Sequence, residues 1–189
     1  MRIPFDCSSV KVTSPFGKRV LNGTADNHAG YDLVGIGSHT VCAVEGGRVV
    51  RSRIVTDKKD PTWQWGNYVC ILTDGGRYHY YCHLASRNVN EGQTVKRLDK
   101  LGVMGNTGYS FGAHLHFEVR EADGKTAVSP ENILGIPNKS GRYTLSQLDE
   151  DIMTLYKNGV VKTPEYWEKN ASKMRFVPEL LHNMAERLE

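Results

Sequence analysis

The chain has 189 residues, of which 39% are hydrophobic and 24% charged, as expected for a soluble globular protein with one compact domain and a small appendage. No apolar stretch approaches the roughly 18 residues that a membrane-spanning helix needs, and the start of the sequence lacks the apolar segment of a signal peptide. The formal net charge of +3 is uneven, because residues 1–142 carry 18 Lys and Arg against 13 Asp and Glu, a balance that suits either an anionic polymer or an ordinary solvated surface.

Residues 1–135 contain short runs of β-branched and aromatic residues separated by turn residues at intervals of about 8–12 positions. This spacing predicts a mainly β fold, an antiparallel sandwich or an open barrel. The hairpin around Asp74-Gly75-Gly76 is the strongest of these signals, because an apolar run precedes the turn and an aromatic run follows it. The strands that we expect cover residues 10–16, 40–44, 48–55, 67–73, 77–84, 100–104 and 112–120.

The character of the sequence changes after residue 135. We expect a linker over residues 136–144, where Pro and Gly occur without periodicity, and a small helical module over residues 145–189. A helical period starts at Ser146 and stops at Asn158-Gly159, and Thr163-Pro164 has the form of a helix start. A last helix should begin at Pro178, with an apolar stripe made of Leu180, Leu181, Met184 and Leu188.

Four cysteines occur, and none forms a C-x-x-C pair, so a cysteine zinc site is not expected. Free, mostly buried thiols are the expectation for a chain without a signal peptide. If a disulfide forms, Cys70 and Cys82 are the pair that we expect, because they fall on neighbouring predicted strands.

The segment GAHLHFEVR places two histidines one residue apart in an apolar run. A strand directs residues i and i+2 to the same face. His114, His116 and Glu118 therefore share one face, and the apolar residues between them form the other face. One face of this strand suits burial, and the other suits chemistry or water.

Further histidines and a carboxylate occur in the β-rich part, at His28, Asp32 and His83. Two or three imidazoles with one carboxylate suit zinc, whose catalytic sites keep one position for water. A His-x-x-x-Asp pattern alone is weak evidence, and His-x-His also occurs in unrelated metal proteins. The five residues together favour a metal site over scattered surface histidines.

The same residues resemble a known family. HAGYD at 28–32, YCHL at 81–84 and HLHFE at 114–118 are similar to the three signature segments of the M23 (lysostaphin/LytM-type) zinc metallopeptidases, and they occur in the family's order. The flanking VTSPFGKRV and GNTGYSFG are similar as well, so the resemblance covers roughly residues 5–135. The chain departs from the family at Ala113, where proline is frequent, and has Cys82 at a variable position.

The resemblance implies roles for individual residues. His28, Asp32 and His116 would bind one zinc ion per chain, and His83 and His114 would act on the water as base and as oxyanion-stabilising or acid group, in an order that the sequence leaves open. Glu118 shares the face of His116 and can either orient its imidazole or form a surface ion pair.

The resemblance also implies a substrate, the peptide of peptidoglycan, held in a groove between loops. The groove loops that we expect are residues 22–27, 55–65, 86–90 and 106–111. Each candidate contact can equally be a packing residue. The candidate substrate-contacting residues are Trp63, Trp65, Asn67, His79 and Tyr109.

These observations together predict a zinc endopeptidase that acts at the bacterial cell wall, without a nucleic-acid partner or a membrane span. Without a signal peptide, we expect synthesis in the cytoplasm and release in the manner of a phage or prophage endolysin. The helical tail would bind the wall, a partner protein or a second copy. The alternatives are a catalytically silent wall-binding domain of the same fold and an amidase that cuts the sugar–peptide junction.

Overall fold

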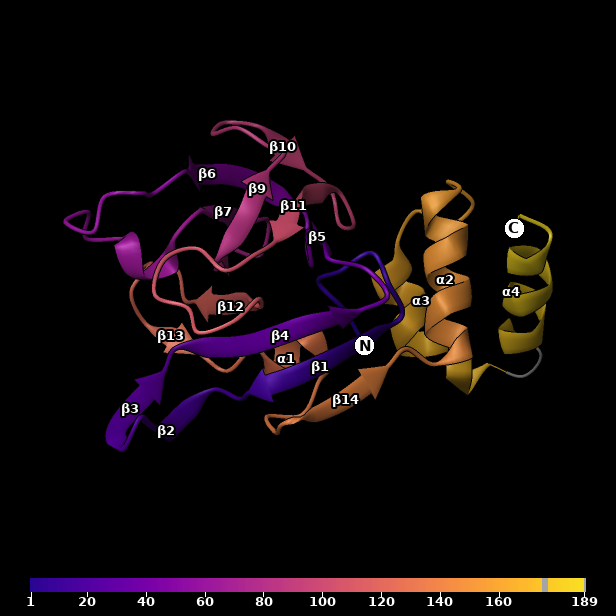
Figure 1. Cartoon of the computed structure of the whole chain (residues 1–189). Helices are drawn as coiled ribbons and strands as arrows, with labels where there is room; N and C mark the ends of the chain where they lie inside the picture. The colour runs from indigo at the N-terminus through magenta and orange to yellow at the C-terminus, as the bar shows by residue number, and fades with distance from the viewer. Residues whose placement is uncertain (175–176, 189) are drawn as a thin grey trace. The chain divides into compact units, whose positions relative to one another are not determined.

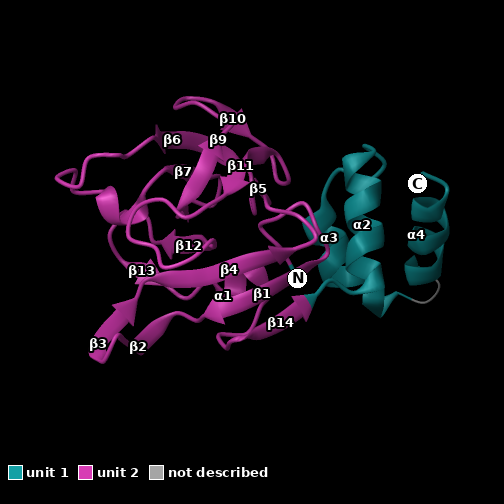
Figure 2. Cartoon of the chain, in the orientation of Figure 1, with its two compact units in different colours: residues 1, 144–189 teal, residues 2–143 magenta. Residues whose placement is uncertain are grey.

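In this computed structural model, residues 1–174 and 177–188 are described. The chain divides into two compact units, which Figure 2 colours separately. The larger unit contains residues 2–143, and the smaller contains residues 144–189 together with Met1. All four cysteines are free thiols, so the possible Cys70–Cys82 pair is not bonded.

The larger unit is built on one antiparallel sheet, which has nine strands among the described residues (Figure 1). This arrangement confirms the mainly β, antiparallel prediction. In spatial order the strands are β10 (Thr94–Val95), β6 (Gly47–Arg53), β7 (Tyr68–Thr73), β8 (Tyr78–Cys82), β12 (Leu115–Arg120), β4 (Gly30–Ile36), β1 (Ser9–Ser14) and β14 (Gly141–Thr144), and β13 (Ala127–Val128) pairs with β12.

Strand β12 is central to this sheet and is buried on both of its faces. Leu115, Phe117 and Val119 have no exposed surface and form one face with the rings of their cross-strand neighbours. His116 and Glu118 alternate with them on the other face and are also buried. The predicted alternation is therefore present, and the polar face lies beneath the groove described below.

Two smaller sheets complete the β part of this unit. A three-stranded sheet is formed by β5 (Thr40–Cys42), β11 (Lys100–Met104) and β9 (Leu84–Arg87). A hairpin is formed by β2 (Gly17–Leu21) and β3 (Thr24–His28), and its two-residue turn has positive φ at Asn22 and Gly23. The predicted loop at 22–27 is thus largely a strand, because Asn-Gly is a hairpin turn rather than the start of a loop.

The predicted linker at residues 136–144 requires a correction. Residues 141–144 form β14, which is hydrogen-bonded to β1 at the edge of the main sheet. The boundary between the two compact units falls at Thr144, after this strand. Because β14 is a four-residue edge strand with half-buried positions, its sequence shows too little alternation to be recognised. Before it come two short helical turns, η1 (Trp63–Trp65) and α1 (Glu131–Leu134).

The smaller unit is helical. Its elements are α2 (Gln147–Lys157), α3 (Pro164–Asn170), η2 (Ala171–Lys173) and α4 (Val177–Glu186). Ser146 and Asp149 form a capping box at the start of α2, and Pro164 occupies the first turn of α3.

The apolar side chains of this unit divide between its core and its surface. Ile152 and Leu155 are fully buried, as the helical period predicts. In α4, Leu181 is buried with Ala185, whereas Leu180 and Met184 of the predicted stripe are exposed. Among the described residues, none of the helices has the length and apolar character needed to cross a membrane.

Candidate metal centre and its groove

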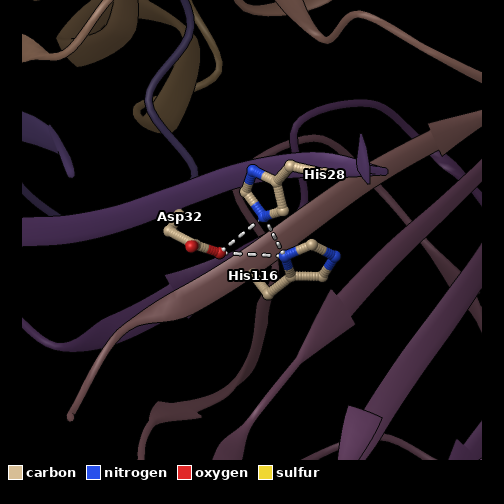
Figure 3. Close-up of side chains that lie close together, drawn as sticks. All are labelled: His28, Asp32 and His116. Carbon is tan, nitrogen blue, oxygen red and sulfur yellow. Dashed lines mark hydrogen bonds and ion pairs between the residues drawn. The ribbon is translucent and has the colours of Figure 1, made fainter. Parts of the chain in front are cut away.

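Three side chains from three strands converge at one point of the larger unit (Figure 3). His28 ends β3, Asp32 lies in β4, and His116 lies in β12 directly opposite Asp32 in the strand register. Asp32 Oδ1 lies 3.0 Å from His28 Nε2 and 2.9 Å from His116 Nδ1, and the two nitrogens are 3.0 Å apart. The sheet register thus assembles residues that are 88 positions apart in the sequence.

Each imidazole of this group is oriented by its outward nitrogen. Nδ1 of His28 donates to the carbonyl of Pro15 at 2.8 Å, and Nε2 of His116 donates to Glu118 Oε1 at 3.0 Å. A carbonyl or a carboxylate can only accept, so these outward nitrogens carry hydrogen. In the neutral imidazoles the inward nitrogens, Nε2 of His28 and Nδ1 of His116, are therefore lone pairs.

This donor set fits a divalent metal ion. Two lone pairs and a carboxylate oxygen that face each other at about 3 Å repel unless a cation lies between them, and the three atoms belong to residues that could hold a metal ion. Two nitrogens and one oxygen form a ligand set that zinc accepts, and tetrahedral ligands at about 2.0–2.1 Å from zinc are about 3.3 Å from one another. The observed separations are within a few tenths of an ångström of this value.

The electrostatics of the group are consistent with a cation site. Burial opposes ionisation of Asp32, but the hydrogen bonds from the surrounding imidazoles outweigh it and hold the pKa of this carboxyl well below its usual range. Burial lowers the pKa of His116, but hydrogen bonds to Asp32 and Glu118 raise it to about 9. A metal ion must therefore displace a proton from His116, which makes metal binding dependent on pH.

Glu118 is the buried carboxylate behind His116. It is 2% exposed and accepts hydrogen bonds from His116, from Trp65 Nε1 at 3.0 Å and from Arg120 Nε at 2.7 Å. Burial opposes its ionisation, but the contacts with His116 and Arg120 lower its pKa. Of the two roles predicted for Glu118, the structure places it against the imidazole and not at the surface.

Asp32 has a second partner on its other oxygen. Arg19 of β2 donates from Nη1 to Asp32 Oδ2 at 3.2 Å and from Nε to Asp26 at 2.7 Å. This contact leaves Asp32 Oδ1 to face the imidazoles. Sequence reasoning assigned no role to Arg19, because the hairpin that brings β2 beside the metal centre was not predicted.

His83 and His114 lie next to each other beside the three ligand atoms, with ring centroids 4.7 Å apart. Nδ1 of His83 donates to the carbonyl of Thr107 at 2.8 Å, and Nδ1 of His114 donates to the carbonyl of Gly112 at 2.7 Å. Nε2 is therefore the free nitrogen of each neutral ring. Nε2 of His114 is 3.4 Å from Asp32 Oδ1. Burial lowers the pKa of His83 to about 4, so this imidazole is neutral at pH 7.

These side chains lie in a groove of about 630 Å³ in the larger unit. The hairpin β2–β3 contributes Arg19, Leu21 and Asp26 to its lining. The segment before β12 contributes Tyr109 and Phe111, whose rings meet edge to face with centroids 5.1 Å apart and which are 51% and 68% exposed. The arrangement can hold an extended chain past a metal ion and two imidazoles.

The sequence profile of peptidase family M23 matches residues 26–130, which is more than half of the chain and includes all five histidine and aspartate positions described above. The chain belongs to peptidase family M23. The metallopeptidase fold and its candidate metal ligands therefore agree with the expectation drawn from the three signature segments.

Relatives of this M23 peptidase include two curated proteins. One is "Peptidoglycan DD-endopeptidase ShyB" of Vibrio cholerae, 33% identical over 122 residues, which are 62% of this chain and 27% of that protein. The other is "Lysostaphin" of Staphylococcus simulans, 32% identical over 124 residues, which are 61% of this chain and 23% of that protein. The matched region thus spans about a quarter of the length of these relatives.

Solved structures show the same fold. The catalytic domain of lysostaphin from Staphylococcus simulans superposes with a TM-score of 0.54 at 28% identity, over 67% of this chain and 92% of that one. The prophage-encoded M23 protein EnpA of Enterococcus faecalis gives a TM-score of 0.54 at 26% identity, over 69% and 92%. Both alignments cover most of the neighbour and about two thirds of this chain.

The five predicted substrate-contacting residues divide into three groups. Trp65 and Tyr109 line the groove of this M23 peptidase. Trp63 packs beside Tyr109, with ring centroids 6.3 Å apart, and the side chain of Asn67 accepts a hydrogen bond from the backbone of Val55. Both of these are packing roles, and neither residue is among those that line the groove.

The prediction for His79 is wrong. Its side chain has no exposed surface and meets the ring of Phe117 on the core face of the sheet. His83 does not share that face although it lies four residues later, because its backbone has φ 62° and breaks the alternation at the end of β8. The predicted groove loop at 86–90 does not line the groove either, and residues 84–87 form β9.

Proposed function

We propose that this M23 peptidase is a zinc-dependent endopeptidase that hydrolyses peptide bonds of peptidoglycan. The observation that carries the proposal is one groove in which the three ligand atoms of His28, Asp32 and His116 lie beside the free nitrogens of His83 and His114. The printed names of the relatives, a peptidoglycan DD-endopeptidase and a glycyl-glycine endopeptidase, support this substrate class.

His28, Asp32 and His116 would hold the zinc ion. When bound, zinc supplies a Lewis acid that polarises a carbonyl and lowers the pKa of a water. The chain contributes the fixed orientation of the ligands: the Pro15 carbonyl and the Glu118 carboxylate hold the outward nitrogens of the two imidazoles, so that the inward nitrogens point to the ion.

His83 and His114 would handle the protons. The neutral His83 presents a lone pair on Nε2, which is the form needed to accept a proton from the attacking water. In this proposal, His114 Nε2 donates to the oxygen of the scissile carbonyl or to the departing amine. Both rings keep their orientation during these steps, because backbone carbonyls hold their Nδ1 atoms.

The groove suits a flexible, extended peptide. It runs between the hairpin β2–β3 and the segment that carries Tyr109 and Phe111, whose exposed rings offer contact surface for a chain with small side chains. The site of action would be the bacterial cell wall, and lysis of whole cells by the added protein would test an endolysin-type, bacteriolytic role.

The deciding experiment uses purified cell walls from several species, incubated with the protein with and without a chelator. We expect new amine termini, identified by mass spectrometry, that disappear on chelation and return when zinc is added. The masses of the fragments identify the bond, whether in a cross-link or in a stem peptide. Walls that are bound but not cut would instead indicate a catalytically silent binding domain, and release of intact peptides from the sugar would indicate an amidase.

The role of the helical unit belongs to the same proposal. Its functions could be binding of the wall, of a partner protein or of a second copy, and one structural neighbour is a protein crystallised in the "SpoIIQ-SpoIIIAH pore forming complex", which matches 66% of this chain with a TM-score of 0.53 at 26% identity. Pull-down of walls and measurement of the molecular mass in solution, with and without residues 144–189, distinguish these functions.

A further inference from the structure

We propose that Thr107 is the positioning residue of His83: it fixes the imidazole through its backbone carbonyl and holds that carbonyl in place through its own hydroxyl. The inference rests on the proposed function in one respect, namely that His83 acts on the proton. The arrangement of Thr107 itself is independent of that function.

Thr107 makes three hydrogen bonds, and each reaches a segment that frames His83. Its carbonyl accepts from His83 Nδ1 at 2.8 Å. Its hydroxyl donates to the carbonyl of Leu84 at 3.0 Å and accepts from the backbone N–H of Asn67 at 2.9 Å. The hydroxyl thus anchors the residue to both strand ends, and the carbonyl is directed at the imidazole between them.

His83 needs this support because its own backbone is in an unfavourable conformation. Its φ of 62° lies in the left-handed region, which residues other than glycine adopt rarely and at a cost. The conformation turns its side chain away from the core face that His79 and Tyr81 occupy. It is held by backbone hydrogen bonds from His83 N to the Trp65 carbonyl at 2.8 Å and from Leu84 N to the Asn67 carbonyl at 2.9 Å.

Two glycines allow Thr107 to come this close. A Cβ atom on Gly66 would overlap the backbone carbonyl of Thr107, and a Cβ atom on Gly108 would overlap the backbone nitrogen of Gly66. Both glycines have positive φ, 61° and 75°. The segments 65–67 and 106–108 are therefore packed backbone against backbone, and the position of the Thr107 carbonyl is set by this contact together with its hydroxyl bonds.

The consequence for His83 is a single tautomer. Because the Thr107 carbonyl can only accept, the proton of the neutral imidazole stays on Nδ1 and the lone pair stays on Nε2. A displaced Thr107 carbonyl would release both the orientation and the tautomer. The ligand group would remain, since none of its hydrogen bonds involves Thr107.

The experiment compares Thr107→Val with Thr107→Ser in the full, zinc-loaded chain. Valine keeps the shape of the side chain but can neither donate to Leu84 nor accept from Asn67, whereas serine keeps both bonds. The matched control is Thr73→Val in the β7–β8 hairpin, where the hydroxyl of Thr73 likewise donates to the Arg77 carbonyl at 3.1 Å and accepts from the Arg77 N–H at 3.2 Å. Thr73 is buried and does not line the groove.

All proteins are measured at a temperature at which each is fully folded by circular dichroism. We expect Thr107→Val to lower kcat on a wall peptide by about 100-fold with little change in KM or zinc content, since a misplacement of about 1 Å costs about that much. Thr107→Ser and Thr73→Val should stay within about threefold of the unsubstituted chain. In nitrogen–proton spectra of the imidazoles, the Nδ1–H signal of His83 should be lost or shifted in Thr107→Val alone.

Two results would overturn the inference: a Thr107→Val protein that keeps its kcat and its Nδ1–H signal, or a Thr73→Val protein that loses as much kcat as Thr107→Val. If the unsubstituted chain cuts no wall peptide, the proposed function fails. The spectra then still decide whether Thr107 sets the tautomer of His83.

Discussion

Replacement of Glu118 by Gln tests how far the carboxylate behind the metal centre determines metal affinity. Oε1 of Glu118 accepts from both His116 and Trp65, and Oε2 accepts from Arg120. A glutamine has one oxygen and one NH2 group in the same two places. With the oxygen toward His116, its NH2 group faces the guanidinium of Arg120; with the oxygen toward Arg120, its NH2 group faces two N–H donors. Either orientation leaves a mismatched contact in a buried place.

The magnitude follows from what His116 loses. Its outward nitrogen is held by a charged acceptor that fixes the ring and makes the inward nitrogen a stronger ligand. Removal of such a partner costs about 10- to 100-fold in metal affinity, which is about 1.4–2.7 kcal/mol. We expect Glu118→Gln to weaken zinc binding within this range and to lower the activity at limiting zinc by the same factor, with activity partly restored at excess zinc.

The assay is competition for zinc with a chromophoric chelator at constant pH, for the unsubstituted chain and for the variant. Glu121→Gln is the control, because Glu121 lies three residues further on and pairs with Arg77 at the surface, where both side chains are more than two-fifths exposed. Its zinc affinity should be unchanged. An equal zinc affinity for Glu118→Gln and the unsubstituted chain would refute the reasoning, since it would mean that Glu118 acts only in packing.

Three further predictions follow from the larger unit. Burial lowers the pKa of His79 to about 3 from its ordinary 6.5, so the unfolded chain takes up the proton first, and stability that is present above pH 6.5 should be lost as the pH falls toward 3. Chemical denaturation should show His79→Leu losing about 2 kcal/mol less than the unsubstituted chain between pH 7 and pH 5, and equal losses would contradict this. Gly108→Ala should destabilise the fold by about 1–3 kcal/mol and lower kcat. Gly23→Ala has a similar φ of 80° with open space around it, so it isolates strain from overlap, and equal effects of the two variants on kcat would count against the interlocked loops. A chain ending at Tyr143 should keep its zinc and cut short peptides, and loss of either would show that the helices are part of the catalytic fold.

The sequence was sufficient for much of the fold and for the ligand group, for reasons that particular residues make clear. Alternation in GAHLHFEVR identifies the polar face of β12, and this needs only the two-residue period of a strand. The capping box at Ser146 and the proline at the start of α3 are local signals as well. Features that depend on fewer than about six residues of local pattern, such as β14, were missed.

What could not be predicted depends on contacts between distant segments. His79 and His83 are four residues apart and would share a strand face, but the left-handed backbone at His83 separates them. Which nitrogen of each imidazole faces the groove is decided by Pro15, Thr107, Gly112 and Glu118, and three of these partners act through backbone carbonyls that leave no trace in the side-chain pattern. Arg120, by contrast, lies two residues after Glu118 on the same strand, so alternation could have placed it beside that carboxylate.

The three ligands belong to β3, β4 and β12, and so a bound ion is also a cross-link between the β2–β3 hairpin and the centre of the sheet. An ion present at 100 times its dissociation constant would stabilise the folded chain by about 2.7 kcal/mol. Scarcity of metal should then affect the persistence of the protein as well as its chemistry. Metal-starved molecules would open first where the hairpin meets the sheet, and proteases would remove them before the metal-loaded ones.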